Sequence, residues 1–173
     1  MPITWNDQFL ALFRSCLEKY NSGDSDFNRY YSSEDISFLS SIGYKPRELF
    51  DFVEDFADEG VHTESTSLLV AAVRRDYFFA VQDKQLSDKE ISRDDIPPFN
   101  ETLTDIPYLP RIIAKARAKL RGELDPDLMY GCGGDRKFLS DHGDIPVADF
   151  LRNVWAAGTD DLKIASYVKN YTA

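Results

Sequence analysis

The feature that most constrains this chain is a pair of segments that share their helix signals at a fixed spacing of 100 residues. The first, YYSSEDISFLSSIGYKPRELF, begins at Tyr30, and the second, YGCGGDRKFLSDHGDIPVADF, begins at Tyr130. The residues of the first segment that recur 100 positions later, without a gap, are Tyr30, Asp35, Phe38, Leu39, Ser40, Gly43, Pro46 and Phe50. In both segments a short helix is expected to end at the glycine and another to begin at the proline, the positions that these residues favour. The segments therefore predict an internal repeat.

The alternative is convergence, because glycine stops and proline starts recur in any helical protein. Further pairs favour a true repeat. With small shifts, Gly60 matches Gly158, and Arg75-Asp76-Tyr77 matches Lys169-Asn170-Tyr171. The first helices also match in kind, Leu12 and Phe13 with Ile112 and Ile113. The agreement thus includes core aromatic and leucine positions as well as helix ends.

Apolar residues recur at helical spacing through most of the chain, and strand signatures are absent. The expected helices are 7–20, 33–42, 46–57 and 64–82, then 108–121, 135–141, 146–157 and 160–171. The prediction is an all-α protein of two tandem four-helix units, residues 1–82 and 107–173, which pack as one domain with approximate two-fold pseudo-symmetry. The acidic, proline-containing residues 83–106 are expected to form a linker or a wrapping segment.

Charge and composition narrow the class of protein. The formal net charge is −10, which argues against nucleic acid and anionic membrane surfaces as partners. No apolar run approaches the roughly 20 residues that span a bilayer, and the first residues do not resemble a signal peptide. Two cysteines, Cys16 and Cys132, form no disulfide framework. A cytoplasmic protein with two free thiols, either a monomer or a homodimer, is expected.

Three motifs of the second half carry a family resemblance: LPRIIAKARAKLRGEL from Leu109, MYGCGGDRKFL from Met129, and DFLRNVW from Asp149. They resemble the bacterial domain-of-unknown-function 5069 family, over about residues 105–171. The family pattern has a Leu-Pro-Arg helix with an internal Lys-Ala-Arg, a Tyr and a Cys before an Asp, and a closing helix that ends in an aromatic residue. The matching residues are Leu109, Pro110, Arg111, Lys115, Ala116, Arg117, Tyr130, Cys132 and Asp135. The resemblance implies no established activity.

The loop around Cys132 is the first candidate site. A cysteine becomes a nucleophile when a helix N-terminus and nearby cations stabilise its thiolate, and Arg136 lies one turn into the next helix. Gly133 and Gly134 would let backbone N–H groups converge on an anion. The alternative is a turn whose glycines adopt positive φ, with Asp135 stabilising the helix start and Cys132 buried. The alternative is favoured, because no nearby histidine supplies a general base.

Cations form the second candidate site. Arg111, Lys115 and Lys119 lie along one side of their helix, while Arg74 and Arg75 interrupt an apolar helix of the first half. The residues of the predicted anion site are Arg74, Arg75, Arg111, Lys115, Gly133, Gly134, Asp135 and Arg136. The favoured alternative is ion pairing: of the basic helix with the acidic surface, especially the acidic residues of helix 46–57, and of Arg74 and Arg75 with that same helix.

Those acidic residues, the acidic stripe, are Asp51, Glu54, Asp55 and Asp58, with the i, i+3, i+4, i+7 spacing of carboxylate metal sites. Such sites usually recruit a histidine three residues from a glutamate, and neither His62 nor His142 has that spacing. A solvated face is favoured over a Mg²⁺ site, so no metal and no cofactor are predicted.

The sequence leaves open whether the protein is an enzyme and favours a non-catalytic module. It would bind a partner protein or a small anionic ligand at the junction of the two halves. The alternative is a small enzyme that uses Cys132, with Arg136 and Arg111, on an anionic substrate.

Overall fold

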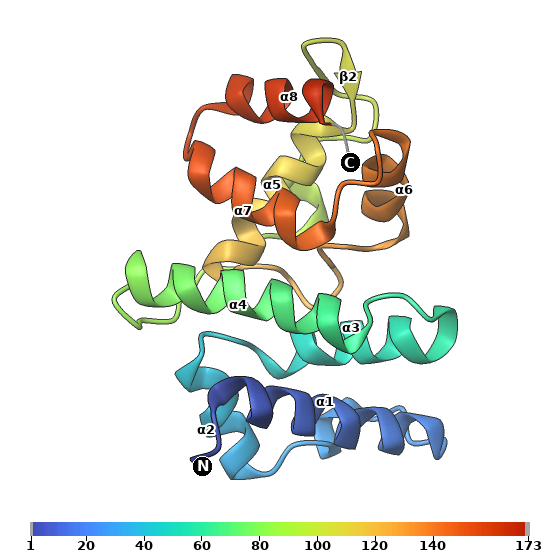
Figure 1. The fold of residues 1–173 in the computed structure, drawn as a ribbon, viewed down its shortest axis with the longest axis vertical. Helices are drawn as coiled ribbons and strands as arrows, with labels where there is room; N and C mark the ends of the chain where they lie inside the picture. Colours follow the sequence, from blue (N-terminus) through green and yellow to red (C-terminus); the bar gives the residue numbers. More distant parts are fainter. Residues whose placement is uncertain (1, 172–173) are drawn as a thin grey trace. The chain divides into compact units, whose positions relative to one another are not determined.

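The structure is a computed structural model that describes residues 2–171 and is mostly α-helical (Figure 1). Within these residues it has eight α-helices and one sheet of two short strands. The predicted all-α class is therefore confirmed in this broad form. The chain divides into two compact units, and the boundary falls between Gln85 and Leu86.

The first unit contains four α-helices and a 3-10 turn. They are α1 (Trp5–Asn21), the turn η1 (Phe27–Arg29), α2 (Ser33–Ser41), α3 (Pro46–Glu59) and α4 (Glu64–Ala80). Capping boxes mark where α1 and α2 begin. Thr4 exchanges hydrogen bonds with Asp7 before α1, and Ser32 exchanges them with Asp35 before α2. Each of these capping boxes satisfies backbone N–H groups that the helix itself leaves without acceptors.

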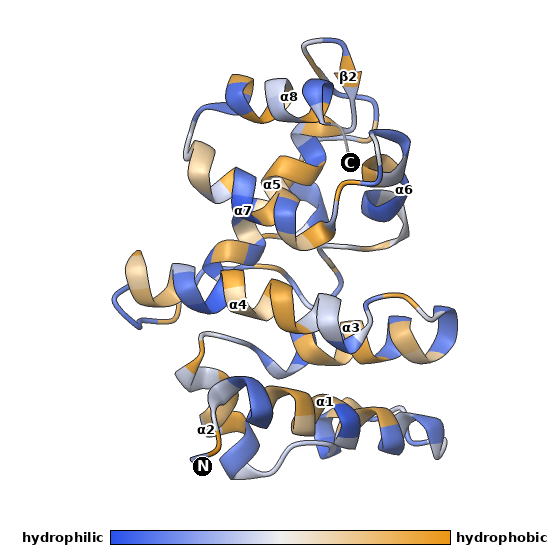
Figure 2. Ribbon diagram, in the orientation of Figure 1, coloured by the Kyte–Doolittle hydropathy of each residue, from blue (hydrophilic) through white to orange (hydrophobic). Residues whose placement is uncertain are grey.

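Aromatic side chains build the core of the first unit, where α1 packs against α3 and α4. Phe9 lies edge-on to Tyr44, with ring centroids 5.7 Å apart, and Phe13 lies 6.0 Å from Phe56. Apolar residues recur along every helix between hydrophilic stretches, as expected for helices that each bury one side (Figure 2).

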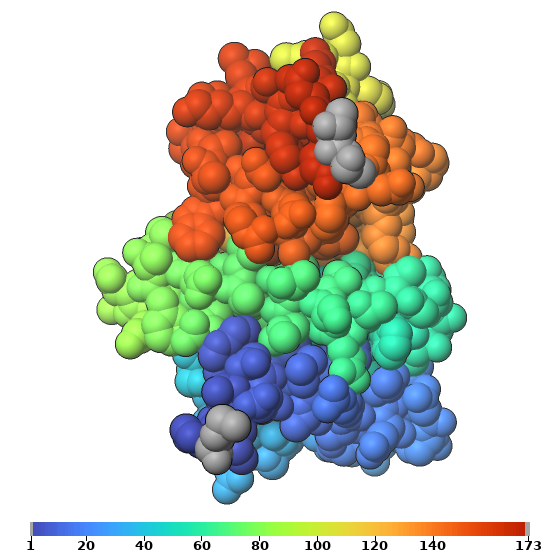
Figure 3. Space-filling view, viewed as in Figure 1, coloured from blue at the N-terminus to red at the C-terminus, as the bar shows by residue number. Residues whose placement is uncertain are grey.

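The second unit has four α-helices, a 3-10 turn and the small sheet. They are η2 (Arg93–Asp95), β1 (Thr102–Leu103), β2 (Ile106–Pro107), α5 (Leu109–Arg121), α6 (Gly133–Asp141), α7 (Val147–Ala157) and α8 (Asp161–Asn170). Helix α7 packs against both α5 and α8. The side chains of α7 and α8 form a continuous surface on the face shown in Figure 3.

The segment expected to link the halves is bound to the second unit. Ser87 donates a 2.7 Å hydrogen bond to the Glu123 carboxylate, and Ile91 exchanges backbone hydrogen bonds with Glu123 and Asp125. Residues 102–107 form an antiparallel hairpin, which the sequence analysis missed. Its strands have two residues each, too few to show an alternating pattern. Thr104 and Asp105 occupy the turn with φ of 48° and 65°, the left-handed conformation that two-residue hairpin turns require.

The first glycine of the repeated pattern is required by packing as well as by backbone conformation. Gly43 has φ of 73°, and a Cβ added there would lie 2.4 Å from the Phe78 ring. The corresponding Gly143, with φ of 98°, lies close to Tyr171, which follows α8. The aromatic partner in α4 is thus Phe78, one residue after the Tyr77 that the sequence comparison had matched with Tyr171.

Candidate functional site

Two oppositely charged side chains meet inside the second unit. The Lys115 ammonium, from the middle of α5, donates a hydrogen bond of 2.6 Å to the Asp135 carboxylate, in the first turn of α6. The exposed fraction of the side chain is 2% for Lys115 and 0% for Asp135. Because a charge removed from water is costly unless it is paired, each residue depends on the other.

The Asp135 carboxylate also accepts hydrogen bonds from two further donors. The Tyr108 hydroxyl donates to Oδ1 at 2.8 Å, and the Gly131 backbone N–H donates to Oδ2 at 2.8 Å. Burial, followed by the nearby Asp135 charge, raises the pKa of the Tyr108 hydroxyl, so the phenol remains a proton donor. One carboxylate therefore connects both α5 and the residue before it to the turn that precedes α6.

The Cys132 sulfur is the third group beside this ion pair. Lys115 Nζ donates a hydrogen bond of 3.1 Å to Cys132 Sγ, and the cysteine is half-buried. Helix α6 begins directly after Cys132, whose own side chain makes no capping hydrogen bond. A nearby cation and a helix N-terminus both stabilise a thiolate, the form of cysteine that attacks electrophiles. Tyr108, Lys115, Cys132 and Asp135 are called the Cys132 cluster below.

The other cysteine has a different environment. Cys16 is a free thiol buried in the core of the first unit, and burial raises its pKa to about 11. Its sulfur is therefore protonated and shielded at neutral pH, whereas Cys132 is only half-buried.

The glycines around Cys132 serve two different purposes. Gly131 has φ of 89°, which agrees with the predicted turn. Gly133 and Gly134 instead lie in the first turn of α6 and are exposed, so the prediction of positive φ does not hold for them. A Cβ added to Gly134 would lie 2.8 Å from the Tyr108 hydroxyl oxygen. This glycine thus lets Tyr108 approach the helix and reach Asp135.

The arginines predicted beside Cys132 have other partners as well. Arg136 donates a 3.1 Å hydrogen bond to the Gly131 carbonyl, so it stays close to the cysteine loop. Arg111 donates a 2.8 Å hydrogen bond to the Pro97 carbonyl, and its guanidinium lies 4.1 Å from the centroid of the Phe99 ring. Arg111 therefore holds the segment before the hairpin against α5.

Arg74 and Arg75 belong to α4 of the first unit. Arg74 donates a 2.8 Å hydrogen bond to the Gln82 side chain and lies over Phe78. Arg75 lies over Phe79 and next to Asp76. The expected salt bridges of these two arginines to helix 46–57 stay a prediction. A pocket that these two arginines share with Arg111 stays a prediction.

Other cations of α5 form ion pairs, with carboxylates of their own unit. Arg117 contacts Asp161 at 2.5 Å, and Arg121 contacts Glu123 at 2.6 Å. Lys115 pairs with Asp135 in the same way, and pairing of this helix with the acidic stripe stays a prediction. Residues of the stripe have partners within the first unit: Arg47 contacts Asp51 at 2.8 Å, His62 contacts Asp55 at 3.5 Å, and Tyr20 donates a hydrogen bond of 2.9 Å to Asp58. Among residues 2–171, no group of three or more His, Cys, Asp or Glu side chains is arranged to hold a metal ion.

Tyr108 is a member of the cluster that the sequence analysis missed. The signal was present in the spacing: Tyr108 lies seven residues before Lys115, and residues at i and i+7 share one side of a helix. The partner Asp135 lies 20 residues beyond Lys115, across a turn whose path the sequence does not specify.

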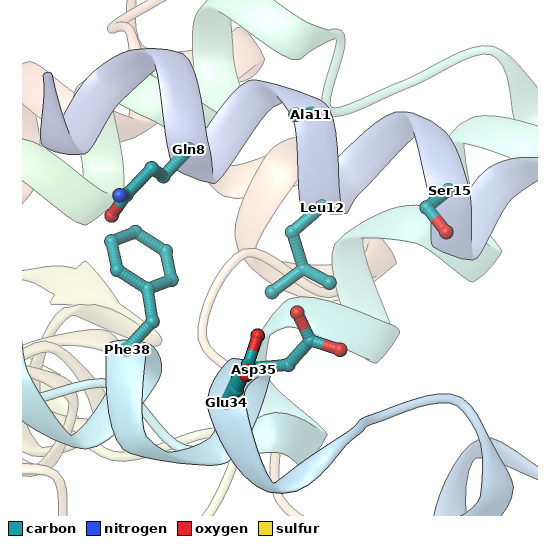
Figure 4. Close-up of a pocket in the computed structure, with 7 residues that line it drawn as sticks. All are labelled: Gln8, Ala11, Leu12, Ser15, Glu34, Asp35 and Phe38. Atoms are coloured by element: carbon teal, nitrogen blue, oxygen red, sulfur yellow. The ribbon is translucent and has the colours of Figure 1, made fainter. Parts of the chain in front are cut away.

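The first unit has a pocket of about 370 Å³ between α1 and α2 (Figure 4). Its lining residues are Gln8, Ala11, Leu12, Ser15, Glu34, Asp35 and Phe38. Figure 4 shows Leu12 and Phe38 on opposite helices, with the Asp35 carboxylate pointing toward α1. The pocket therefore combines an apolar wall with negative charge.

No protein-family model, no curated protein and no solved structure matches this chain. The family resemblance of residues 105–171 accordingly stays a prediction. Within residues 2–171, none of the helices has the length and apolar character needed to cross a membrane.

Proposed function

We propose that the second unit carries a reactive thiol centre, in which Cys132 attacks a small electrophilic molecule with an anionic group. The observation that carries this proposal is the 3.1 Å hydrogen bond from the Lys115 ammonium to the Cys132 sulfur. Lys115 is itself held by Asp135, so its charge stays beside the sulfur without a rearrangement. Such preorganised charge is what activates cysteine nucleophiles.

Each residue then has a distinct role in the proposal. Cys132 is the nucleophile, and Lys115 is the positioning cation that stabilises its thiolate. Asp135 orients Lys115, which is a positioning role as well. Gly133 and Gly134 are exposed and begin α6, so their N–H groups, together with Arg136, would favour a negatively charged group near the sulfur.

A second candidate function is a non-catalytic module that binds a partner protein or a small ligand. The pocket between α1 and α2 favours it, because that pocket has volume and charge but no cysteine or histidine in its lining. If the ligand is an anion that binds at the junction of the two halves, Arg74, Arg75 and Arg111 are the residues that would bind it.

We further infer that the two units are copies of one ancestral four-helix unit. Helices α2 and α6 both have nine residues and begin 100 residues apart, at Ser33 and Gly133. Buried positions follow the same spacing. The pairs, all buried, are Phe9 with Leu109, Phe13 with Ile113, Cys16 with Ala116, Leu39 with Leu139, and Phe50 with Phe150. Matching burial supports common descent, since convergent helix ends would not align the cores.

The thiol proposal is tested by alkylation with iodoacetamide at neutral pH. The Cys16→Ala variant, which takes the residue found at the corresponding position 116, leaves Cys132 as the single thiol. We expect native Cys132 to react about tenfold faster than the same cysteine in denaturant, since only the folded chain places Lys115 beside it. Lys115→Met should remove the acceleration.

The matched control is Lys137→Met, which removes an exposed ammonium from α6 that pairs with Asp141. It should leave the alkylation rate unchanged. A native rate no faster than the rate in denaturant, or equal rates in the two methionine variants, would overturn the proposal.

A further inference from the structure

The pocket of the first unit corresponds, residue by residue, to the cluster of the second unit. Adding 100 to the lining residues Gln8, Ala11, Leu12, Ser15, Asp35 and Phe38 gives Tyr108, Arg111, Ile112, Lys115, Asp135 and Phe138. Three members of the Cys132 cluster are therefore the counterparts of pocket residues. The correspondence uses the proposed common origin of the units and does not depend on the reactivity of Cys132.

The two sites differ in the length of the side chains on the first helix. In the second unit the long side chains of Tyr108 and Lys115 reach the Asp135 carboxylate and fill the space beside it. In the first unit the counterparts are Gln8 and Ser15, which are shorter. Beside these shorter side chains the first unit has the pocket of about 370 Å³.

The Asp35 carboxylate in the pocket accepts side-chain and backbone hydrogen bonds at one of its two oxygens. Asp35 Oδ2 accepts hydrogen bonds from the Ser32 N–H at 2.9 Å and from the Ser32 hydroxyl at 2.8 Å. These bonds cap α2 and engage one oxygen, whereas Asp135 accepts bonds at both of its oxygens. The neighbouring Glu34 adds a second negative charge to the lining.

We propose that this pocket binds a small aromatic amine. Its ammonium would take the place of the Lys115 ammonium, against Asp35 and near Glu34, and its ring would lie between Leu12 and Phe38, where it replaces the Tyr108 phenol (Figure 4). The ligand would thus carry the two groups that contact Asp135 in the second unit, an ammonium and a phenol. Charge complementarity selects a cation, and the apolar wall selects a ring.

Tyramine, which joins a phenol to a primary ammonium, is the probe. The full chain is titrated with tyramine while amide chemical shifts are followed by NMR, and we expect saturation with a Kd of about 1 mM, as is usual for a ligand of this size. The shifted amides should belong to α1 and α2. The anionic analogue 4-hydroxyphenylacetate should cause no saturable shift.

The decisive variant is Ser15→Lys, which gives the first unit the lysine of the second. The new ammonium should occupy Asp35 and weaken tyramine binding at least about tenfold, while the Ser32 cap and the fold, checked by circular dichroism, remain. Ser41→Lys adds the same charge outside the pocket lining and should bind tyramine like the parent chain.

Equal affinity of the Ser15→Lys variant and the parent chain for tyramine would overturn the proposal, as would saturable binding of 4-hydroxyphenylacetate at the same amides. The alkylation rate of Cys132 is a separate measurement on a different unit. The amine-binding proposal and the thiol proposal can therefore be contradicted independently of each other.

Discussion

Asp135 is the residue on which most of the second unit's site depends. Its carboxylate accepts hydrogen bonds from Lys115, Tyr108 and Gly131, which lie in two stretches of the chain: α5 with the residue before it, and the turn before α6. The corresponding Asp35 carboxylate accepts its hydrogen bonds from Ser32, at the start of its own helix. The same residue type at matching positions therefore has a local role in one unit and a long-range role in the other.

This difference predicts unequal effects of the same substitution. Asp135→Asn leaves the buried Lys115 ammonium without its negative partner, so we expect the free energy of unfolding to fall by about 3–5 kcal/mol. Asp35→Asn weakens a half-exposed cap and should cost about 1 kcal/mol. Urea unfolding followed by circular dichroism measures both. Similar losses in the two variants would show that the Lys115 pair contributes no more than a cap.

The sequence predicted that helix α6 exists, but it did not predict the residue at which the helix begins. The predicted start at Asp135 was wrong by two residues, because Gly133 and Gly134 read as turn residues while they form the first helical turn. The carboxylate of Asp135 reaches back to the Gly131 N–H, so the aspartate stabilises the helix from within it. The glycines have a packing role, since Gly134 leaves room for Tyr108.

Neighbouring alanine substitutions separate helix propensity from packing in α6. Gly133→Ala places a Cβ no closer than 3.8 Å to the Arg136 side chain, so it should stabilise the unit by up to about 1 kcal/mol through helix propensity. Gly134→Ala has the same propensity gain but pushes the Tyr108 hydroxyl away from Asp135, and should destabilise by about 1–2 kcal/mol.

Thermal unfolding of the two glycine variants tests this prediction, with the melting temperature expected to rise for one and to fall for the other. If both rise together, Tyr108 moves at no cost, and the close approach of its hydroxyl to α6 is not required.

At the scale of the whole molecule, tyrosine burial gives the chain a characteristic pH response. Burial raises the pKa of both Tyr20 and Tyr167 to about 12, and it raises the pKa of Tyr31, Tyr108 and Tyr130 as well. A raised pKa means that the folded state holds the phenolic proton more tightly than the unfolded state does. The resulting stability is complete below the ordinary tyrosine pKa of 10.0 and is lost as the pH rises toward the folded-state values.

We therefore expect the free energy of unfolding to be constant from about pH 7 to about pH 9 and to fall steeply above about pH 10. Cys16, with its pKa raised from 9.0 to about 11, adds to the loss in the same direction. Urea titrations at several pH values measure the decline, and tyrosinate absorbance should appear together with unfolding. Stability that is unchanged through pH 11 would contradict the tyrosine burial described above.

Parts of this molecule could be predicted from sequence because they depend on local signals. The helical class, the stop at Gly43 and the start at Pro46 follow from residue preferences over a few positions. The contacts of Lys115 could not be predicted, because they join residues 17 and 20 positions apart across an irregular turn. The hairpin at 102–107 was missed because it rests on two left-handed residues, neither of them glycine.

The contacts of the segment from Ser87 to the hairpin determine how the second unit would respond to cleavage of the backbone. Upstream, Ile91 pairs with Leu124, and Arg93 donates to the Asp127 carbonyl. Downstream, β2 leads directly into α5. A protease cut at the exposed turn between Thr104 and Asp105 would thus leave both new ends held by contacts of their own. This turn is the place where the second unit would accept new termini, as in a circular permutation, with its core intact.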